Sequence, residues 1–428
     1  VASFAGYGVS LAVAAWTVVR DLPGWTLRML TVPYADDIAA ARDWMRRNPA
    51  VARVAGLARG TGVGTIGAIV LLSLAWLRTV VPSLVEMFIN GRPAFNAPAE
   101  AVPGVADVLG DVISLAFVAV AAALAVVGLL RGRPDRWPWL ILVLGPLVAI
   151  TVAGVVDQQL PGLVTLALML AAVAVWLCPP DPRVLVAIGA LGTASAVLSI
   201  LMAVVRPDVA LLSGAAAGDK SLLLGGLLAG PFLHSNVLGI GLALSLPFLF
   251  GVRSRLLRGG MLMVVLLAVA WTGARTAQLA VVAVLLVHLS IRYAPRRWRG
   301  STWLLSAPVA AAFALVVAVP LLTRDPDGFT ERGRIWQALL GRWADRPLLG
   351  WGPGVFDRPE LADALGGRFT HGHNVLVHLL VVGGVLAAVL FAGLVVLAWR
   401  QSLAPARAGQ PAPVLFLVAL ALVSLLEA

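Results

Sequence analysis

The chain has 428 residues, of which 60% are hydrophobic and 12% are charged, and its formal net charge is +11. A soluble domain has too little interior for so many apolar side chains, so the composition indicates an integral membrane protein. Arginine supplies almost all of the positive charge and lies beside apolar runs, which is typical of membrane orientation and not of nucleic-acid binding, and the single cysteine excludes a disulfide framework.

Apolar runs long enough to cross a bilayer as a helix, about 20 residues each, recur along the chain. They fall at about 1–19, 61–88, 112–130, 138–156, 161–178, 184–205, 235–250, 260–273, 276–291, 302–322, 374–399 and 414–428. The sequence therefore predicts an all-α polytopic membrane protein of about twelve transmembrane helices, with residues 1–428 forming a single helical domain. Arg20 follows the first run, whereas a cleaved signal peptide carries its positive charge before the apolar run.

The connections between these runs alternate in charge. One set is rich in arginine and comprises 20–60, 131–137, 251–259, 292–301 and 400–413, together with 179–183, which holds only Arg183. The alternate set has no such excess and comprises 89–111, 157–160, 206–234, 274–275 and 323–373. Because arginine accumulates on the cytoplasmic side of membrane proteins, the first set is predicted to be cytoplasmic and the second external.

Residues 323–373 form the long polar loop of the external set. Within it, Ile335, Leu339 and Trp343 recur at helical spacing, which predicts an amphipathic helix at about 331–344 that lies on the outer membrane surface. The glycines and proline of residues 350–354 predict a tight turn after this helix.

The segment 260–291 must accommodate two helices and a turn between two cytoplasmic connections. At 1.5 Å per residue each helix is about 24 Å long, which is shorter than the hydrocarbon core of about 30 Å. We therefore expect the turn around Arg275 to lie below the outer surface and to face a hydrated cavity.

Three arginines of the external set are candidates for binding an anion. A guanidinium at membrane depth, as predicted for Arg275, is costly and is rarely left unpaired. Arg332 and Arg334 begin the predicted surface helix, and their planar guanidinium groups suit bidentate contact with a diphosphate. The structural alternative is a solvated helix face on which Glu331 and Asp345 act as local ion-pair partners.

Two imidazoles, those of His371 and His373, lie just before the span that begins at 374. Imidazole titrates near neutral pH and can accept a proton from an attacking hydroxyl. A His-x-His pair without a third ligand is a weak metal site, so we expect no metal. His234 and Asn236, at the end of the 206–234 connection, are candidate substrate contacts on the same face.

The order of three sequence blocks resembles the O-antigen ligase and polymerase superfamily of bacterial envelopes. The blocks are Gly230-Pro-Phe-Leu-His-Ser-Asn236-Val-Leu-Gly, Thr272-Gly-Ala-Arg275-Thr, and Arg334-Ile-Trp336 followed by Asp345-Arg-Pro-Leu-Leu-Gly-Trp-Gly-Pro-Gly-Val-Phe356 and His371-Gly-His373-Asn374. Ala274 stands where the family usually has Ser. Gly384 matches a position of the ligase pattern, whereas Ala387 does not, which weakens ligase relative to polymerase.

The resemblance implies an inverting glycan transfer that needs no metal and no soluble cofactor. The donor would be an undecaprenyl-diphosphate-linked glycan, and the acceptor a glycan, a lipid or a cell-wall component. The reaction would occur on the outer leaflet of the bacterial cytoplasmic (inner) membrane, among membrane lipids. Carried over to this sequence, His373 would be the base, Asn374 its neighbour, and Arg275 and Arg334 the groups that hold the diphosphate. We expect His371 and Asn374 to contact the substrate.

A transporter or flippase of lipid-linked glycans, without chemistry, is the competing class. Transporters commonly have two related halves and polar residues near the middle of the membrane. This sequence has neither an internal repeat nor such a cluster, so we favour the enzyme. The sequence leaves the choice between ligase and polymerase open.

Overall fold

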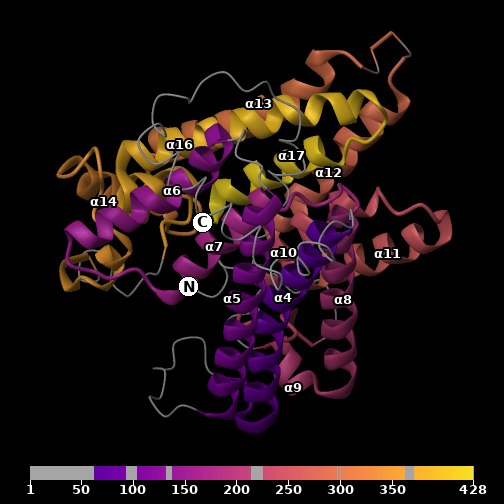
Figure 1. Cartoon of the computed structure of the whole chain (residues 1–428), viewed down its shortest axis with the longest axis horizontal. Coiled ribbons are helices and arrows are strands. Elements are labelled where there is room, and N and C mark those ends of the chain that lie inside the picture. Colours follow the sequence, from indigo (N-terminus) through magenta and orange to yellow (C-terminus); the bar gives the residue numbers. More distant parts are fainter. Residues whose placement is uncertain are drawn as a thin grey trace.

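The computed structural model describes residues 62–92, 104–131, 137–213, 225–295, 297–298, 300–361 and 371–427, and these residues are almost entirely helical (Figure 1). The helices are α4 (Val63–Asn90), α5 (Val105–Arg131), α6 (Trp137–Val156), α7 (Leu163–Leu177), α8 (Val184–Val205), α9 (Pro207–Ala210), α10 (Ser235–Leu249), α11 (Arg255–Thr272), α12 (Arg275–Tyr293), α13 (Thr302–Leu322), α14 (Arg332–Ala344), η4 (Pro353–Asp357, a 3-10 helix), α16 (Val375–Arg407) and α17 (Ala412–Leu426). One short antiparallel pair, β1 (Leu211–Leu212) with β2 (Leu227–Leu228), lies in the 206–234 connection.

The predicted all-α, polytopic membrane fold is confirmed. Eight of the described helices are long and apolar enough to cross a membrane, and three further apolar helices, α7, α10 and α17, are shorter. Each of these helices falls on a predicted span. The predicted span at 1–19 and the basic segment 20–60 lie outside the described residues.

The helices on either side of Arg275 are longer than predicted. α11 has 18 residues and begins at Arg255, and α12 has 19 residues and ends at Tyr293. Both helices extend into the arginine-rich segments that flank them, because arginine is a good helix former and its long side chain can reach water from the end of a span. The expected 24 Å helices are therefore corrected to lengths of about 27 and 28 Å.

Helix α17 occupies the centre of the described bundle. Every residue from Val414 to Leu425 is buried, and the helix packs against α10, α12, α13 and α16. A helix that is apolar on all sides is suited to such a position, since no face needs water. Its last turn is followed directly by Glu427, which contacts residues at the beginnings of α10, α14 and α16.

Contacts between connecting segments follow the charge alternation of the sequence. Each of the following contacts joins two residues that lie in a connection, or in the adjoining end of a span, that the charge pattern predicts on one side of the membrane. They are Arg407 to Thr302, Asp181 to Thr65, Arg92 to Gly230 and Arg346 to Asp157. These four contacts agree with the predicted grouping of the connections.

The guanidinium of Arg92 holds the 206–234 connection from the end of α4. It donates to the backbone carbonyls of Val209 at 2.7 Å, Gly230 at 2.6 Å and Phe232 at 2.9 Å. Burial lowers the pKa of Arg92 to about 10, so the group remains cationic at neutral pH. This contact fixes the segment that leads into α10.

Helix α16 is interrupted where the long external loop meets it. Gly384 has φ +65° and breaks the helix. The loop then supplies backbone partners in both directions: Trp351 and Gly352 donate N–H groups to the carbonyls of Val381 at 2.8 Å and Val382 at 3.0 Å. In return, Val385 donates to the carbonyl of Pro347 at 2.9 Å. The glycine-rich turn predicted at 350–354 is the part of the loop that docks here.

The predicted amphipathic helix at 331–344 is present as α14, but its apolar side faces protein. Ile335, Trp336 and Leu339 are buried and form a cluster with Val377 and Val381 of α16. The expectation that the apolar stripe of α14 faces the membrane surface is therefore corrected. The stripe faces α16, because the long loop docks on α16 at the break in that helix.

Candidate active site

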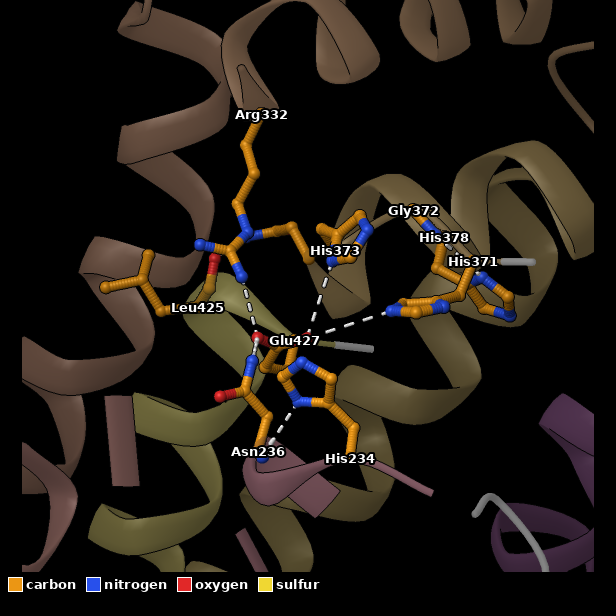
Figure 2. A network of polar contacts seen from close by, with 10 residues as sticks. His234, Asn236, Arg332, His371, Gly372, His373, His378, Leu425 and Glu427 are labelled. Carbon is orange, nitrogen blue, oxygen red and sulfur yellow. Dashed lines mark hydrogen bonds and ion pairs between the residues drawn. The ribbon is translucent and has the colours of Figure 1, made fainter. Parts of the chain in front are cut away.

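Glu427 is the centre of a polar network at the ends of several helices (Figure 2). Its Oε1 lies 2.6 Å from Nη2 of Arg332 and accepts a hydrogen bond from Nδ2 of Asn236 at 3.3 Å. Its Oε2 lies 3.7 Å from Nε2 of His371 and 3.4 Å from Nδ1 of His373. Only 13% of the Glu427 side chain is exposed. One carboxylate therefore joins residues from three other parts of the chain.

The two imidazoles project from a short turn that ends at the start of α16. His373 has φ +48°, a left-handed conformation that is uncommon for a residue other than glycine. Such strain persists only where the surroundings enforce it, and it often accompanies function. From inside α16, His378 accepts a hydrogen bond from the N–H of Gly372 at 3.4 Å and stacks on Phe356. The ring of His378 thereby helps to hold the turn in place from within α16.

Asn374 is completely buried and ties the turn to its neighbours. Its Oδ1 caps α16 by accepting from the N–H groups of Leu376 at 2.9 Å and Val377 at 3.2 Å. Its Nδ2 donates to the carbonyls of Val316 at 3.1 Å and Leu425 at 3.0 Å. All its hydrogen-bonding groups are occupied by protein, so the structure gives Asn374 a positioning role and not the substrate contact that we expected.

Arg332 enters the network from the first turn of α14. It follows three consecutive residues with positive φ, Phe329, Thr330 and Glu331, which turn the chain sharply before the helix. The Nε of Arg332 is buried and has no hydrogen-bond partner among the described residues. Its ion pair is with Glu427 and not with Glu331 or Asp345, the local partners considered from the sequence. The Nε–H group of Arg332 can therefore donate a hydrogen bond to a further acceptor.

His234 and Asn236 begin α10 beside Glu427 (Figure 2). Nδ1 of His234 accepts a hydrogen bond from the N–H of Asn236 at 3.0 Å and so caps this helix. One turn further on, a Cβ at Gly239 would lie only 2.8 Å from the Cβ of Ala274. The absence of a side chain at Gly239 therefore lets the turn that carries Arg275 pack directly against the first turns of α10.

Arg275 and Arg334 do not take part in the network. Arg275 is exposed and has no ion-pair partner among the described residues. Arg334 pairs with Asp327 at 2.9 Å, and 46% of its side chain is exposed. Of the arginines proposed from the sequence, Arg332 is thus the one that joins the imidazoles.

The charges of the network shift the pKa values of two of its groups. Burial acts to raise the pKa of Glu427, but hydrogen bonds from His371 and His373 and the charge of Arg332 outweigh it, so the pKa lies well below its usual range. Burial lowers the pKa of His373, although the neighbouring carboxylate opposes this shift. At neutral pH the network therefore combines a carboxylate, a guanidinium and a neutral imidazole at His373.

Sequence reasoning missed Glu427. An available signal was its place: an acidic residue directly after an apolar span, on the side that the charge alternation predicts to be external. Because Glu427 was not recognised, the His-x-His pair was predicted to lack a third ligand and therefore to bind no metal. The carboxylate supplies a third ligand, and the ligand atoms of His371, His373 and Glu427 all lie within 4.8 Å of one another.

A second network pins the long loop to the end of α6. Asp157 accepts from Arg346 at 3.0 Å and from Arg358 at 2.5 Å. The guanidinium groups of both arginines also lie over the indole of Trp351, at 3.8 and 4.6 Å from its centroid. Burial acts to raise the pKa of Asp157, but the two arginines outweigh it and lower this pKa. This clamp fixes the loop that carries Arg332.

Residues 260–392 match the family model described as O-antigen ligase. The matched segment contains the Arg275 turn, α14 and the His371–Asn374 turn, and it ends before Glu427. Comparison with the curated proteins and with the solved structures gives no match.

Proposed function

We propose that the chain acts as a member of the O-antigen ligase superfamily, whose family model matches residues 260–392, and that it transfers a glycan from an undecaprenyl-diphosphate carrier to an acceptor hydroxyl. The observation that carries the proposal is the joining of His371, His373 and Arg332 by one nearly buried carboxylate. A proton acceptor and a cation at one place are the two groups that displacement of a diphosphate requires.

In this mechanism His373 is the base. Its Nδ1 faces Glu427, so when Nδ1 carries the proton and the carboxylate holds it, Nε2 is the nitrogen whose lone pair accepts the proton of the acceptor hydroxyl. The acceptor oxygen attacks the anomeric carbon as the bond from that carbon to the diphosphate oxygen breaks. The hydroxyl proton passes to Nε2, and the configuration at the anomeric carbon is inverted. Such a base contributes about 10²–10⁴ in rate.

The diphosphate needs positive charge as it leaves. Arg332 has an unused, buried Nε, and Arg275 lies on the adjoining turn without an ion-pair partner among the described residues. Each charge-assisted donor in a partly dehydrated site contributes about 3 kcal/mol. We assign these two arginines to the diphosphate and place Arg334, held by Asp327, at the edge of the site. No metal ion is needed in this scheme.

The orientation follows from the charge pattern. The helix ends around Glu427 belong to connections without excess arginine, which supports an external active face. From the family match we infer that the membrane is the bacterial cytoplasmic (inner) membrane. The acceptor is a glycan, a lipid or a cell-wall component, in either a ligase-like or a polymerase-like reaction.

The test is transfer by the purified protein from a prenyl-diphosphate glycan, followed as release of the prenyl diphosphate. His373→Ala is expected to abolish release while the protein remains in the membrane, and His371→Ala to retain part of it. Arg275→Gln should weaken use of the donor more than use of the acceptor. Wild-type turnover by His373→Ala would refute the base assignment. If the wild-type protein moves the donor across vesicles without releasing prenyl diphosphate, it is a flippase and not a transferase.

A further inference from the structure

The carboxylate that orients the proposed base also completes a set of metal ligands. One ligand atom from each of His371, His373 and Glu427 lies within 4.8 Å of the others, and Oε2 of Glu427 faces Nε2 of His371 and Nδ1 of His373. The other carboxylate oxygen is held by Arg332 and Asn236, so Glu427 is fixed with one oxygen turned toward both imidazoles. The three side chains converge in Figure 2.

The distances suit a tetrahedral ion. Metal bonds of about 2.0–2.1 Å to nitrogen and oxygen give ligand-to-ligand distances of about 3.3 Å in a tetrahedron. The two distances from Oε2 to the imidazoles are 3.4 and 3.7 Å. Small rotations of the two rings would close the site, and a water or a substrate oxygen would fill the fourth position.

The ligand types select the kind of ion. Two imidazoles and one carboxylate suit Zn²⁺ and similar transition-metal ions, whereas Mg²⁺ and Ca²⁺ prefer oxygen ligands throughout. The donor set resembles that of three-ligand zinc sites that leave one position open.

We propose that His371, His373 and Glu427 bind a divalent transition-metal ion such as Zn²⁺, and that this ion switches off glycan transfer. Its binding stands on the ligand geometry alone, whereas its inhibitory effect rests on the proposed function. The ion occupies Nδ1 of His373. A neutral imidazole with a metal on Nδ1 carries its proton on Nε2, so Nε2 has no lone pair with which to accept the proton of the acceptor hydroxyl. At the same time the carboxylate of Glu427 binds the ion and no longer holds a proton on Nδ1 of His373.

The positive charge of Arg332 leads to a second prediction, which concerns the affinity for the metal ion. Its guanidinium contacts the same carboxylate and repels a cation placed beside it. A unit charge about 5 Å from a divalent ion changes the affinity by about tenfold even at the dielectric constant of water. Arg332→Gln should therefore bind the metal about tenfold more tightly than the wild type, although the same change weakens use of the diphosphate donor.

The binding experiment uses Co²⁺ as a spectroscopic probe of the purified, chelator-treated protein in detergent. Wild-type protein is expected to bind one equivalent with the intense visible absorption of tetrahedral Co²⁺, and Zn²⁺ should displace it. Both His371→Gln and Glu427→Gln should lose the band while remaining monodisperse. The control His288→Gln alters a histidine of α12 that stacks on Phe250, outside the ligand set, and should bind as the wild type does.

The inhibition experiment measures prenyl-diphosphate release with increasing Zn²⁺ and again after addition of a chelator. Release should fall as the site fills and recover fully with the chelator. Absence of the Co²⁺ band in the wild type, or its persistence in both ligand variants, would overturn the site. Binding without inhibition would overturn the regulatory effect alone. Absence of release under all conditions, with the band present, would count against the proposed function and leave the metal site standing.

Discussion

Replacement of Glu427 by glutamine tests the central feature of the site with almost no change in shape. In the wild type both oxygens of Glu427 accept, one from Arg332 at 2.6 Å and one turned toward His373 at 3.4 Å. In Glu427→Gln the amide oxygen can still accept from Arg332, which leaves the NH₂ group facing the imidazoles. This group donates, so Nδ1 of His373 must become an acceptor and the proton moves to Nε2.

The variant therefore holds His373 in the tautomer that cannot act as a base. We expect the turnover number to fall by about 10²–10⁴, the contribution of a general base, which corresponds to about 3–5 kcal/mol at about 1.4 kcal/mol per factor of ten. The affinity for the donor should not fall, because Arg332 is relieved of its anionic partner. Loss of the ion pair should reduce the stability of the fold by about 1–3 kcal/mol.

The assay is the initial rate of prenyl-diphosphate release over a range of donor concentrations. Glu427→Asp is the matched control, since it keeps the charge and should retain more activity than the amide variant. Thermal unfolding in detergent separates a folded, inactive protein from a denatured one. A folded Glu427→Gln variant whose turnover number lies within about threefold of the wild type would refute the proposed role of the carboxylate.

Three further changes test how the site is supported. Gly384→Ala should lower the thermal stability strongly, because φ is +65° and the new Cβ would lie within 2.2 Å of the carbonyl oxygen of Leu348, whereas Gly341→Ala, which meets nothing within 4 Å, should not. Asp157→Asn should loosen the clamp on the long loop. Since the arginines lower the folded-state pKa of Asp157, the wild-type clamp is fully formed above about pH 3.9 and is lost as the pH falls through the folded value, so stability to unfolding should fall more steeply with acid in the wild type than in the variant. Arg92→Gln should increase hydrogen exchange in residues 225–236, because several backbone carbonyls lose their donor, and equal exchange in both proteins would contradict the role given to Arg92.

The helices could be predicted from the sequence because each depends on local composition. Apolar length fixed the spans, and the spacing of Ile335 and Leu339 fixed α14. The surface that covers an apolar stripe is determined by residues far away in the sequence. A stripe facing lipid and a stripe facing α16 have the same sequence, so the burial of Trp336 against that helix could not be read from the pattern.

The histidines and Arg332 could be proposed from the sequence because they lie in one polar loop. Glu427 could not be linked to them in this way, since it is separated from Arg332 by 95 positions and follows an apolar helix. Only the central position of α17 brings it to the loop. The roles of Arg332 and Arg334 were likewise indistinguishable before the fold was known, because the direction of each side chain depends on where α14 begins and how it packs.

The exchange of backbone partners between the external loop and α16 has a consequence for engineering. A loop grafted from a relative would bring its own glycine-rich turn, but this turn would find backbone partners only if the host helix is interrupted at the same level. Residues 381–386 should therefore be transferred together with 323–373, as one cassette. Chimeras made at the apparent boundary between loop and membrane would cut this unit in two.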